Sequence, residues 1–447
     1  MISGLLPLGV GLELAALVSQ QKPLSWLAAL VFGLYFCLRF GRLNPYPRWL
    51  GIITLGLLLA VVFGVQADPA LWPRLASSAA YYTSFLGALG LMQLLARRLQ
   101  PLRQLHKMLL SGPTSILYPR YVLTAASIGS VLNFGMMNLL CGTLKEHLQR
   151  YPLTEQEQRD GLRSVMVTTL RGFALVPLLA PTSITIAIIS REMPDISWAD
   201  LFPYGLAATL MMVVAGWRHE TRGLKRLRDT IGDDSKTDGM WPLVLGSLLG
   251  LAAMGTLAYL TILTASQSAM VLVPLGAVGY LLWRDRAPKA AWREVTENMV
   301  SMHNEMFIFG CAAVLGGLLG AAAPLGDFAA WLAQAPKYNV LLAVASLFST
   351  ILLAAVGVAP IVSLSLIAGL LAQLAALGVP ILTPAVGLMC GFSLAMIFSP
   401  FGPSTLILAR YSGEAPVRVA FVWNARFVAT VMPMLLLLIF ATYWLHI

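Results

Sequence analysis

The sequence has little charge for its length, and this scarcity limits what the protein can be. Only 11% of its 447 residues are charged, whereas 58% are hydrophobic, and the mean hydropathy is +0.77. Soluble domains carry about 25% charged residues. Apolar runs of about 17–25 residues recur along the chain, and such runs are long enough to cross a hydrocarbon core of about 30 Å. The sequence therefore predicts an all-α polytopic membrane protein.

Groups that catalysis or metal binding would need are also scarce. The four cysteines stand apart in apolar runs, which is typical of small core residues rather than of disulfides or metal ligands. The five histidines lack metal-site spacing, and no glycine-rich phosphate loop precedes a helix. An integral-membrane enzyme that modifies lipids would need clustered His, Asp or Glu at an interface, so this class is disfavoured. The expectation is no enzyme, no catalytic residue and no cofactor, with Na⁺ as the one ion expected to bind.

Positive charge lies between the apolar runs, which explains the net charge of +10 without a nucleic-acid partner. Lys and Arg concentrate in cytoplasmic loops of membrane proteins. This rule predicts a cytoplasmic N-terminus and an outside C-terminus in a plasma membrane of the bacterial inner-membrane type. No Lys or Arg precedes the first apolar run, so that run is interpreted as a retained helix.

Eleven apolar segments are predicted to span the membrane, and two more are predicted to form re-entrant hairpins. The first hairpin, about 109–146, has basic residues on both sides, so the chain is expected to enter and leave on one face. The alternative is a full span across 121–142, which would put the later basic loops outside. The second hairpin is about 338–376. The predicted spans are 3–19, 24–40, 49–66, 76–96, 164–190, 199–217, 240–264, 267–284, 305–323, 381–409 and 419–443.

Two of these spans contain stretches that read alike, about 219 residues apart. Without a gap, Gly172 matches Gly391 and Pro181 matches Pro400. Each stretch is an apolar helix that stops at Pro plus small hydroxyl residues and then resumes. A helix broken inside the membrane and repeated once indicates a secondary transporter. The alternative is that these Pro, Ser and Thr residues are ordinary kink residues of membrane helices.

The charge pattern divides the chain into two repeats of opposite orientation. Each repeat reads span, span, span, hairpin, broken helix, span, and the odd gap between the repeats inverts the second one. The predicted parts are an N-terminal helix (1–23), a first repeat (24–217, with its broken helix at 164–190), a cytoplasmic linker (218–239) and a second repeat (240–447, with its broken helix at 381–409).

This layout resembles the ion transporter superfamily, in particular its divalent-anion/sodium symporters. The resemblance implies that paired hairpins and interrupted helices meet at substrate and sodium sites. It also implies a homodimer that moves its substrate by an elevator motion. Those symporters have Ser-Asn-Thr at both hairpin tips, whereas this chain has Ser130-Val-Leu-Asn133 and Gly357-Val-Ala-Pro360. The resemblance therefore implies the fold and the transport mode rather than dicarboxylate specificity.

The candidate binding residues lie at the two breaks and the two hairpin tips. Free N–H groups at a helix start favour anions, and free carbonyls at a helix end favour small cations. The candidates are Asn133, Gly135, Pro181, Thr182, Ser183, Thr185, Gly357, Pro360, Ser363, Ser399, Pro400, Gly402, Ser404 and Thr405.

Few charges are expected at membrane depth, and each is a candidate for function. Arg171 precedes the first break and is a candidate for attracting an anion, with snorkelling to the cytoplasmic interface as the alternative. Glu13 lies in the middle of the first span. Glu305 is interpreted as marking an interface rather than a proton relay.

The sequence thus predicts a secondary-active transporter of an anionic organic substrate, with membrane lipid, a coupling cation and the substrate as partners. Sodium is favoured over protons because hydroxyl and carbonyl oxygens suit it, and because neither break nor hairpin tip contains Asp or Glu. The alternative is a carrier or flippase for a lipid-linked or amphiphilic anion, suggested by apolar residues near the tips and breaks: Phe134, Met136, Phe398 and Phe401.

Overall fold

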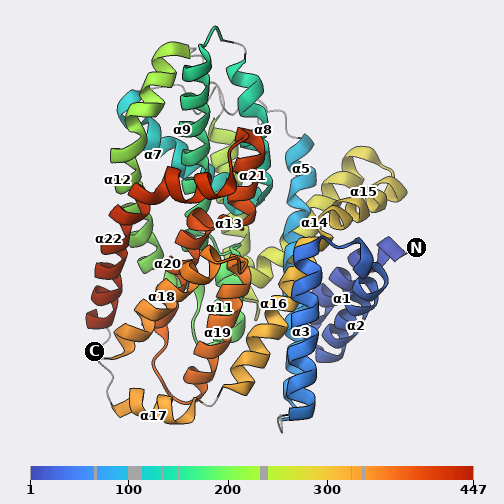
Figure 1. Cartoon of the computed structure of the whole chain (residues 1–447). Coiled ribbons are helices and arrows are strands. Elements are labelled where there is room, and N and C mark those ends of the chain that lie inside the picture. Colours follow the sequence, from blue (N-terminus) through green and yellow to red (C-terminus); the bar gives the residue numbers. More distant parts are fainter. Residues whose placement is uncertain are drawn as a thin grey trace.

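The computed structural model describes residues 2–64, 68–98, 113–132, 134–149, 151–231, 240–323, 325–334 and 338–445, and these residues form helices and no strand. The helices, labelled as in Figure 1, are α1 (Leu5–Ser19), α2 (Lys22–Arg39), α3 (Pro45–Gly64), α4 (Leu71–Gly90), α5 (Met92–Arg98), α7 (Leu117–Leu132), α8 (Phe134–Leu148), α9 (Glu155–Ala174), α10 (Val176–Leu179), α11 (Ile184–Glu192), α12 (Trp198–Ile231), α13 (Met240–Leu260), α14 (Ala265–Asp285), α15 (Pro288–Ser301), α16 (His303–Ala322), α17 (Gly326–Gln334), α18 (Asn339–Ala355), α19 (Pro360–Ala376), α20 (Leu382–Phe398), α21 (Pro403–Ser412) and α22 (Trp423–Leu445).

Within the described ranges, nine helical segments are long and apolar enough to cross a membrane. They are α1, α2, α3, the α9–α11 segment, α12, α14, α16, the α20–α21 segment and the segment that ends in α22. The prediction of an all-α polytopic membrane protein is confirmed. Of the other two predicted spans, α4 has 20 residues and α13 has 21. The predicted total of eleven spans stays a prediction.

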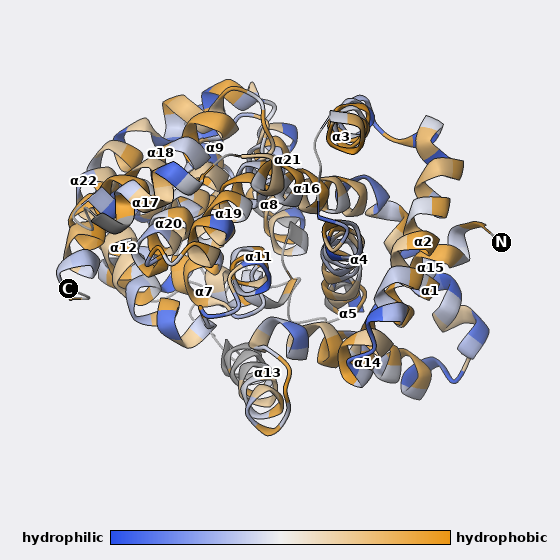
Figure 2. Cartoon of the chain, turned by 90° about the horizontal axis from the view of Figure 1, so that it is seen from below, coloured by the Kyte–Doolittle hydropathy of each residue, from blue (hydrophilic) through white to orange (hydrophobic). Residues whose placement is uncertain are grey.

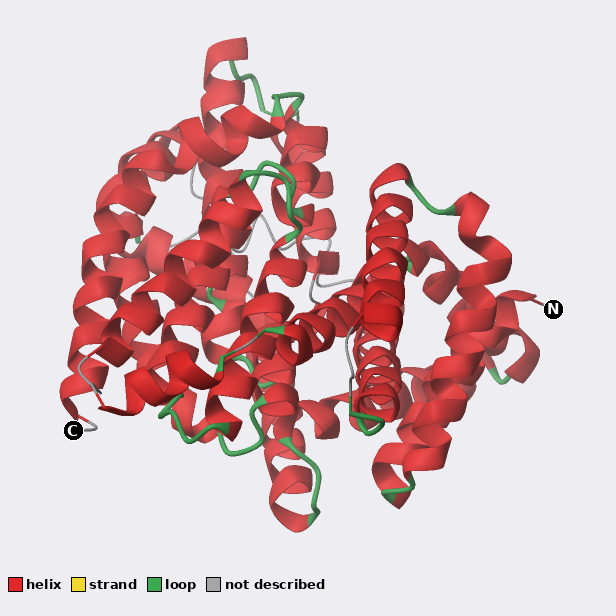
Figure 3. Cartoon of the chain, turned by 60° about the horizontal axis from the view of Figure 1, so that its bottom comes forward, coloured by secondary structure: helices red, strands yellow, loops and turns green. Residues whose placement is uncertain are grey.

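The helices gather into two groups (Figures 2 and 3). We call α1–α5 with α14 and α15 the peripheral group, and α7–α12 with α18–α22 the central group. Helix α16 joins them, because it packs on α4 on one side and on α19 on the other. Its contact with α19 is close: Gly316 lies where an added Cβ would overlap the Ser365 carbonyl oxygen. The two termini lie on opposite sides of the molecule, the N-terminus beside the peripheral group.

Within the central group, helices of one predicted repeat pack against those of the other. Helix α11 packs on α19, and α21 packs on α8, so the second part of each broken helix contacts the other repeat's hairpin region. Helices α7 and α9 pack together, as do α18 and α20. This reciprocal pattern is expected for two repeats related by a local two-fold axis. The predicted repeat boundaries stay predictions.

Both predicted hairpin regions are helix pairs. Helices α7 and α8 flank position 133, and α18 and α19 are joined by the segment 356–359. In that turn Gly357 has φ +114°, which a residue with a side chain rarely adopts. Whether either pair is re-entrant stays a prediction.

In Figure 1 the start of α9 is at the top and α17 is at the bottom, so segments predicted on opposite faces of the membrane lie at opposite ends of the molecule.

The predicted linker 218–239 begins as helix rather than as loop. Helix α12 continues to Ile231, and residues 232–239 lie outside the described ranges. The basic segment remains helical because it buries one face: Leu224 and Leu227 are buried, and Leu227 contacts the helix α9 at Gly161. Arg218, Arg222, Lys225 and Arg226 occupy the exposed face, as expected for an amphipathic helix, whereas Glu220 is buried.

Candidate functional site at two helix breaks

The two predicted breaks have the same backbone conformation at matching positions. The first half of the first broken helix ends before Ala180 (φ −88°, ψ 127°), and the first half of the second broken helix ends before Ser399 (φ −96°, ψ 119°). The second half-helix follows Ser183 (φ −74°, ψ 147°) in one break and Gly402 (φ −70°, ψ 142°) in the other. The gapless alignment of the sequence therefore corresponds to a duplicated local structure.

Equivalent residues of the two broken helices also touch each other. The Ser393 hydroxyl donates to the Ala174 carbonyl oxygen at 2.6 Å, and these residues are 219 positions apart. That separation is the one that aligns the two stretches. A contact between a residue and its own equivalent is expected where two repeats meet at a local two-fold axis, so the broken helices cross there.

The duplicated glycines explain how closely each broken helix packs on its neighbour. A Cβ on Gly172 would lie 2.7 Å from the Val122 carbonyl oxygen of α7. A Cβ on Gly391 would lie 2.7 Å from the Leu347 carbonyl oxygen of α18. Each glycine thus permits the same backbone approach in its own repeat.

Hydroxyl groups of the first break bond to the backbone, with one exception. The Thr182 hydroxyl donates to the Ser130 carbonyl oxygen at 2.5 Å, so this break is tied to the end of α7. The Ser183 hydroxyl accepts from the Ile186 N–H at 3.3 Å and caps α11. Thr185 is fully buried, yet its hydroxyl has no partner in the part of the chain that the structure describes. Pro181 offers only its carbonyl oxygen, which accepts from Ser266 at 2.8 Å.

Hydroxyl groups of the second break mostly bond to the carbonyls of that break. Ser404 donates to the Met396 carbonyl oxygen at 2.6 Å, and Thr405 donates to that of Gly402 at 2.9 Å. Ser399 donates instead to the Ala354 carbonyl oxygen of α18 at 2.6 Å. Pro400 follows Ser399 in this break and has no N–H to donate. A sodium ion here would share the Met396 and Gly402 carbonyls with these hydroxyls, which retain lone pairs of their own.

A small cavity of about 50 Å³ lies where three helices begin. Its lining includes the first residues of α11 (Ile184), α19 (Pro360) and α21 (Pro403). Ser404 lines it as well. Each helix start carries partial positive charge, and its first N–H groups have no partner inside the helix. The cavity therefore joins the second hairpin region to both breaks. Its lining is almost entirely apolar, and two of the three helices begin with a proline that has no N–H.

Glu305 lines the same cavity from α16, and the sequence did not place it there. Its Oε2 atom is buried and has no hydrogen-bond partner among the described residues. The absence of Asp and Glu within the breaks therefore does not extend to the folded site. The only sign of Glu305 in the sequence was that it is a lone acidic residue beside a long apolar run. Its proximity to residues about a hundred positions away required the fold.

The remaining predicted residues are near the site to different degrees. Asn133 lies outside the described residues. Gly135 faces Gln93, where an added Cβ would lie 2.8 Å from its Cγ, so it contacts α5 rather than the cavity. A Cβ built on Gly357 would lie 3.8 Å from the Phe401 ring, so the second hairpin turn is next to the second break. Ser363 is fully buried, and its hydroxyl finds no partner in the described ranges.

Arg171 has protein partners of its own. Its guanidinium lies 3.4 Å from a Glu220 carboxylate oxygen, and both side chains are buried. The guanidinium carbon also lies 4.2 Å from the centre of the Phe427 ring, and Nε donates to Asn424 at 3.4 Å. Arg171 does not line the 50 Å³ cavity. These contacts give it a packing and charge-pairing role between α9, α12 and α22, and the predicted anion attraction stays a prediction.

No protein-family model matches the chain, and no curated protein matches it either.

Proposed function

We propose that the protein is a secondary-active transporter of an anionic organic substrate, driven by a coupled cation. The observation that carries this proposal is the pair of breaks with the same backbone conformation, which meet the second hairpin region at one cavity. Interrupted helices in duplicated positions are the arrangement on which secondary transporters build their substrate and ion sites.

An anion is favoured because three helix starts converge on the cavity. Each contributes a partial charge of roughly +0.5 near its first turn, and buried surroundings weaken the charge less than water does. Irregular backbone at membrane depth is tolerated where it is enclosed by protein or lines a cavity. The 50 Å³ cavity is too small for an organic anion, so the site must enlarge when the substrate enters.

Coupling has two candidate ions. The hydroxyl and carbonyl oxygens of the breaks favour sodium, as the sequence predicts. Glu305 places a carboxylate with one buried, unpartnered oxygen at the same cavity, which makes the proton the second candidate. An elevator motion would carry the central group past α16, where Gly316 and Gly369 let the backbones of α16 and α19 approach closely.

Uptake by purified protein in proteoliposomes tests this proposal. Imposed sodium and proton gradients are compared for a panel of radiolabelled organic anions. Thr185→Ala and Ser404→Ala are expected to lower uptake at least tenfold while leaving the melting temperature within a few degrees, because each removes one buried hydroxyl from a break. Thr296→Ala, on the exposed face of α15, is the control and keeps full uptake. Unchanged uptake in both break variants would refute the assignment.

A second candidate is transport of an amphiphilic or lipid-linked anion. An apolar cavity of about 530 Å³ lies between α2, α3, α4 and α16, lined by Phe32, Phe36 and Phe307 among others. Such a cavity suits acyl chains more than a hydrophilic solute. Flipping of a fluorescent anionic lipid in proteoliposomes distinguishes the two: a solute transporter leaves it at the protein-free rate, and an amphiphile carrier accelerates it.

A further inference from the structure

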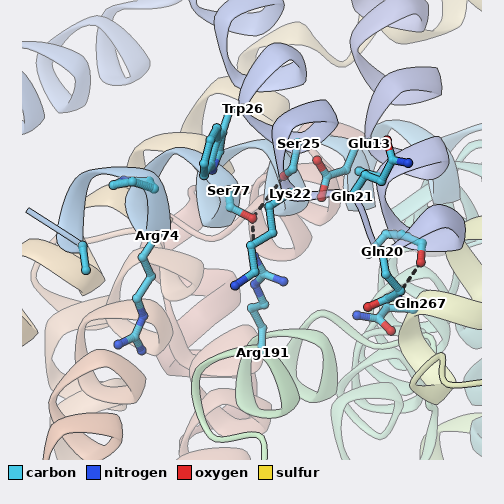
Figure 4. Close-up of a pocket in the computed structure, with 14 residues that line it drawn as sticks. Glu13, Gln20, Gln21, Lys22, Ser25, Trp26, Arg74, Ser77, Arg191 and Gln267 are labelled. Atoms are coloured by element: carbon cyan, nitrogen blue, oxygen red, sulfur yellow. Dashed lines mark hydrogen bonds between the residues drawn. The ribbon is translucent and has the colours of Figure 1, made fainter.

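A larger cavity of about 510 Å³ lies away from the breaks, at the contact between the two helix groups (Figure 4). We call it the α1–α11 pocket. Its lining comes from the ends of α1, α2 and α4 in the peripheral group, from α14, and from the last turn of α11 in the central group. The predicted topology puts all these helix ends on the outer face. The pocket thus gathers four loops that were assigned to one side from charge alone.

Glu13 is the acidic group of this pocket. It lies in the middle of α1 and is 1% exposed, yet its Oε2 atom has no hydrogen-bond partner among the described residues. A buried carboxylate oxygen without a donor costs free energy, so a position like this persists where a donor arrives from elsewhere. Glu13 is the one charged residue of α1, which is otherwise almost entirely apolar.

Arg191 faces the same pocket from the end of α11 and is held in place. Its Nη2 donates to the Ser77 hydroxyl at 2.6 Å, and that hydroxyl lies 3.1 Å from the Ser25 hydroxyl. Its guanidinium carbon also lies 5.1 Å from the centre of the Tyr81 ring. These contacts use one face and one nitrogen of the guanidinium, which leaves further N–H groups for a ligand.

Glu13 and Arg191 line one cavity without forming an ion pair with each other: no described contact joins them within 4.0 Å. Figure 4 shows Glu13 beside Ser25 and Arg191 below Ser77. Lys22 and Arg74 add positive charge at the rim, where the Arg74 side chain is 64% exposed and pairs with Glu192 at 3.6 Å. The lining is therefore net positive, with Glu13 as its single acidic residue.

We propose that the α1–α11 pocket binds a small hydrophilic organic anion that also carries a hydroxyl or ammonium group. A carboxylate of the ligand would accept from Arg191, because charge-assisted hydrogen bonds to a guanidinium are strong and directional. The ligand's hydroxyl or ammonium group would donate to Oε2 of Glu13. A ligand bound this way connects α1 to α11, and so links the two helix groups. The proposal goes beyond the transport function, because a ligand can occupy this pocket whether or not the protein moves a solute through the breaks.

Binding of three related acids to the full chain tests the proposal. The protein is placed in nanodiscs of phosphatidylcholine alone, and malate, aspartate and succinate are titrated by calorimetry and by thermal stabilisation. Malate and aspartate are expected to bind at least about tenfold more tightly than succinate, which lacks the donor for Glu13. Arg191→Gln should weaken all three at least tenfold. Glu13→Met should bring malate and succinate to within about threefold of each other.

The chain supplies a matched control in Arg410, which aligns with Arg191 in the second repeat but is exposed and does not line the pocket. Arg410→Gln should bind malate like the unmodified protein, and melting curves without ligand check that every variant is folded. Equal malate binding by Arg191→Gln, no preference over succinate, or no stabilisation by any of the three acids would overturn the proposal. Loss of malate binding when the discs contain phosphatidylglycerol would assign the pocket to a lipid headgroup and overturn it as well.

Discussion

The buried pair of Arg171 and Glu220 gives the sharpest prediction about stability. The two charges lie 3.4 Å apart with 2% and 8% of their side chains exposed. At an effective dielectric constant of about 20, their attraction is about 5 kcal/mol. Removing the charges from water costs several kcal/mol per ion, which offsets most of that attraction. The pair is therefore expected to contribute little in net terms, while each member alone is costly to leave behind.

This reasoning predicts a specific pattern in a double-mutant cycle. Arg171→Met leaves the Glu220 carboxylate buried without its partner, and Glu220→Met leaves the Arg171 guanidinium buried without its partner. Each single variant should lower the free energy of unfolding by about 3–5 kcal/mol. The double variant replaces both charges by apolar chains of similar length. It should cost only about 0–2 kcal/mol, mainly for the lost cation–π contact with Phe427.

Reversible unfolding in mixed micelles, followed by tryptophan fluorescence, measures these free energies. With these costs the coupling energy of the cycle should exceed about 4 kcal/mol. If the single variants cost less than about 1 kcal/mol each, or if their costs simply add in the double variant, the two charges are not paired in a dry interior. The position assigned to Arg171 between α9, α12 and α22 would then be refuted.

Two further predictions concern α16. Gly316→Ala should lower the free energy of unfolding by about 1–3 kcal/mol and reduce uptake, because its methyl would overlap the Ser365 carbonyl oxygen. The control is Gly276→Ala in α14, whose methyl meets open space and should change neither quantity. Equal melting curves for the two variants would contradict the close packing of α16 on α19. If protons are coupled at the cavity, Glu305→Gln should abolish the dependence of uptake on a proton gradient and leave a sodium-driven rate unchanged. Proton-driven uptake at the full rate in this variant would exclude Glu305 as the coupling group.

The breaks could be predicted from the sequence because they are local and duplicated. Proline and the hydroxyl residues terminate each helix by local backbone chemistry, and the gapless match fixes equivalent positions without any tertiary information. The backbone angles at Ala180 and Ser399 follow from that match. The membrane class was predictable for the same reason, since hydrophobic length is a property of each segment alone.

The partners of the charged groups could not be predicted in this way. Glu220 lies in α12, and its proximity to Arg171 depends on how α9 and α12 cross. Glu305 reaches the breaks because α16 packs on α19 through Gly316, a contact between separate segments. The basic end of α12 was predicted as a linker beyond the span 199–217, because its buried positions, Leu224 and Leu227, are few among many charges. In each case the missing information was a helix–helix contact.

The two breaks share a backbone but use their hydroxyl groups differently, and this difference bears on their roles. Ser404 bonds to the Met396 carbonyl, so the second break satisfies its own helix end. Its equivalent, Thr185, is as deeply buried and has no partner within the described residues. An unpartnered buried hydroxyl is costly, and a ligand that pairs with it recovers that cost. The first break is therefore the better candidate for contact with a bound ion or substrate, and the second is the better candidate for holding the site's shape. On this view Thr185→Ala should weaken substrate affinity, whereas Ser404→Ala should chiefly lower the maximal rate of uptake, because the site loses its shape while the fold stays intact.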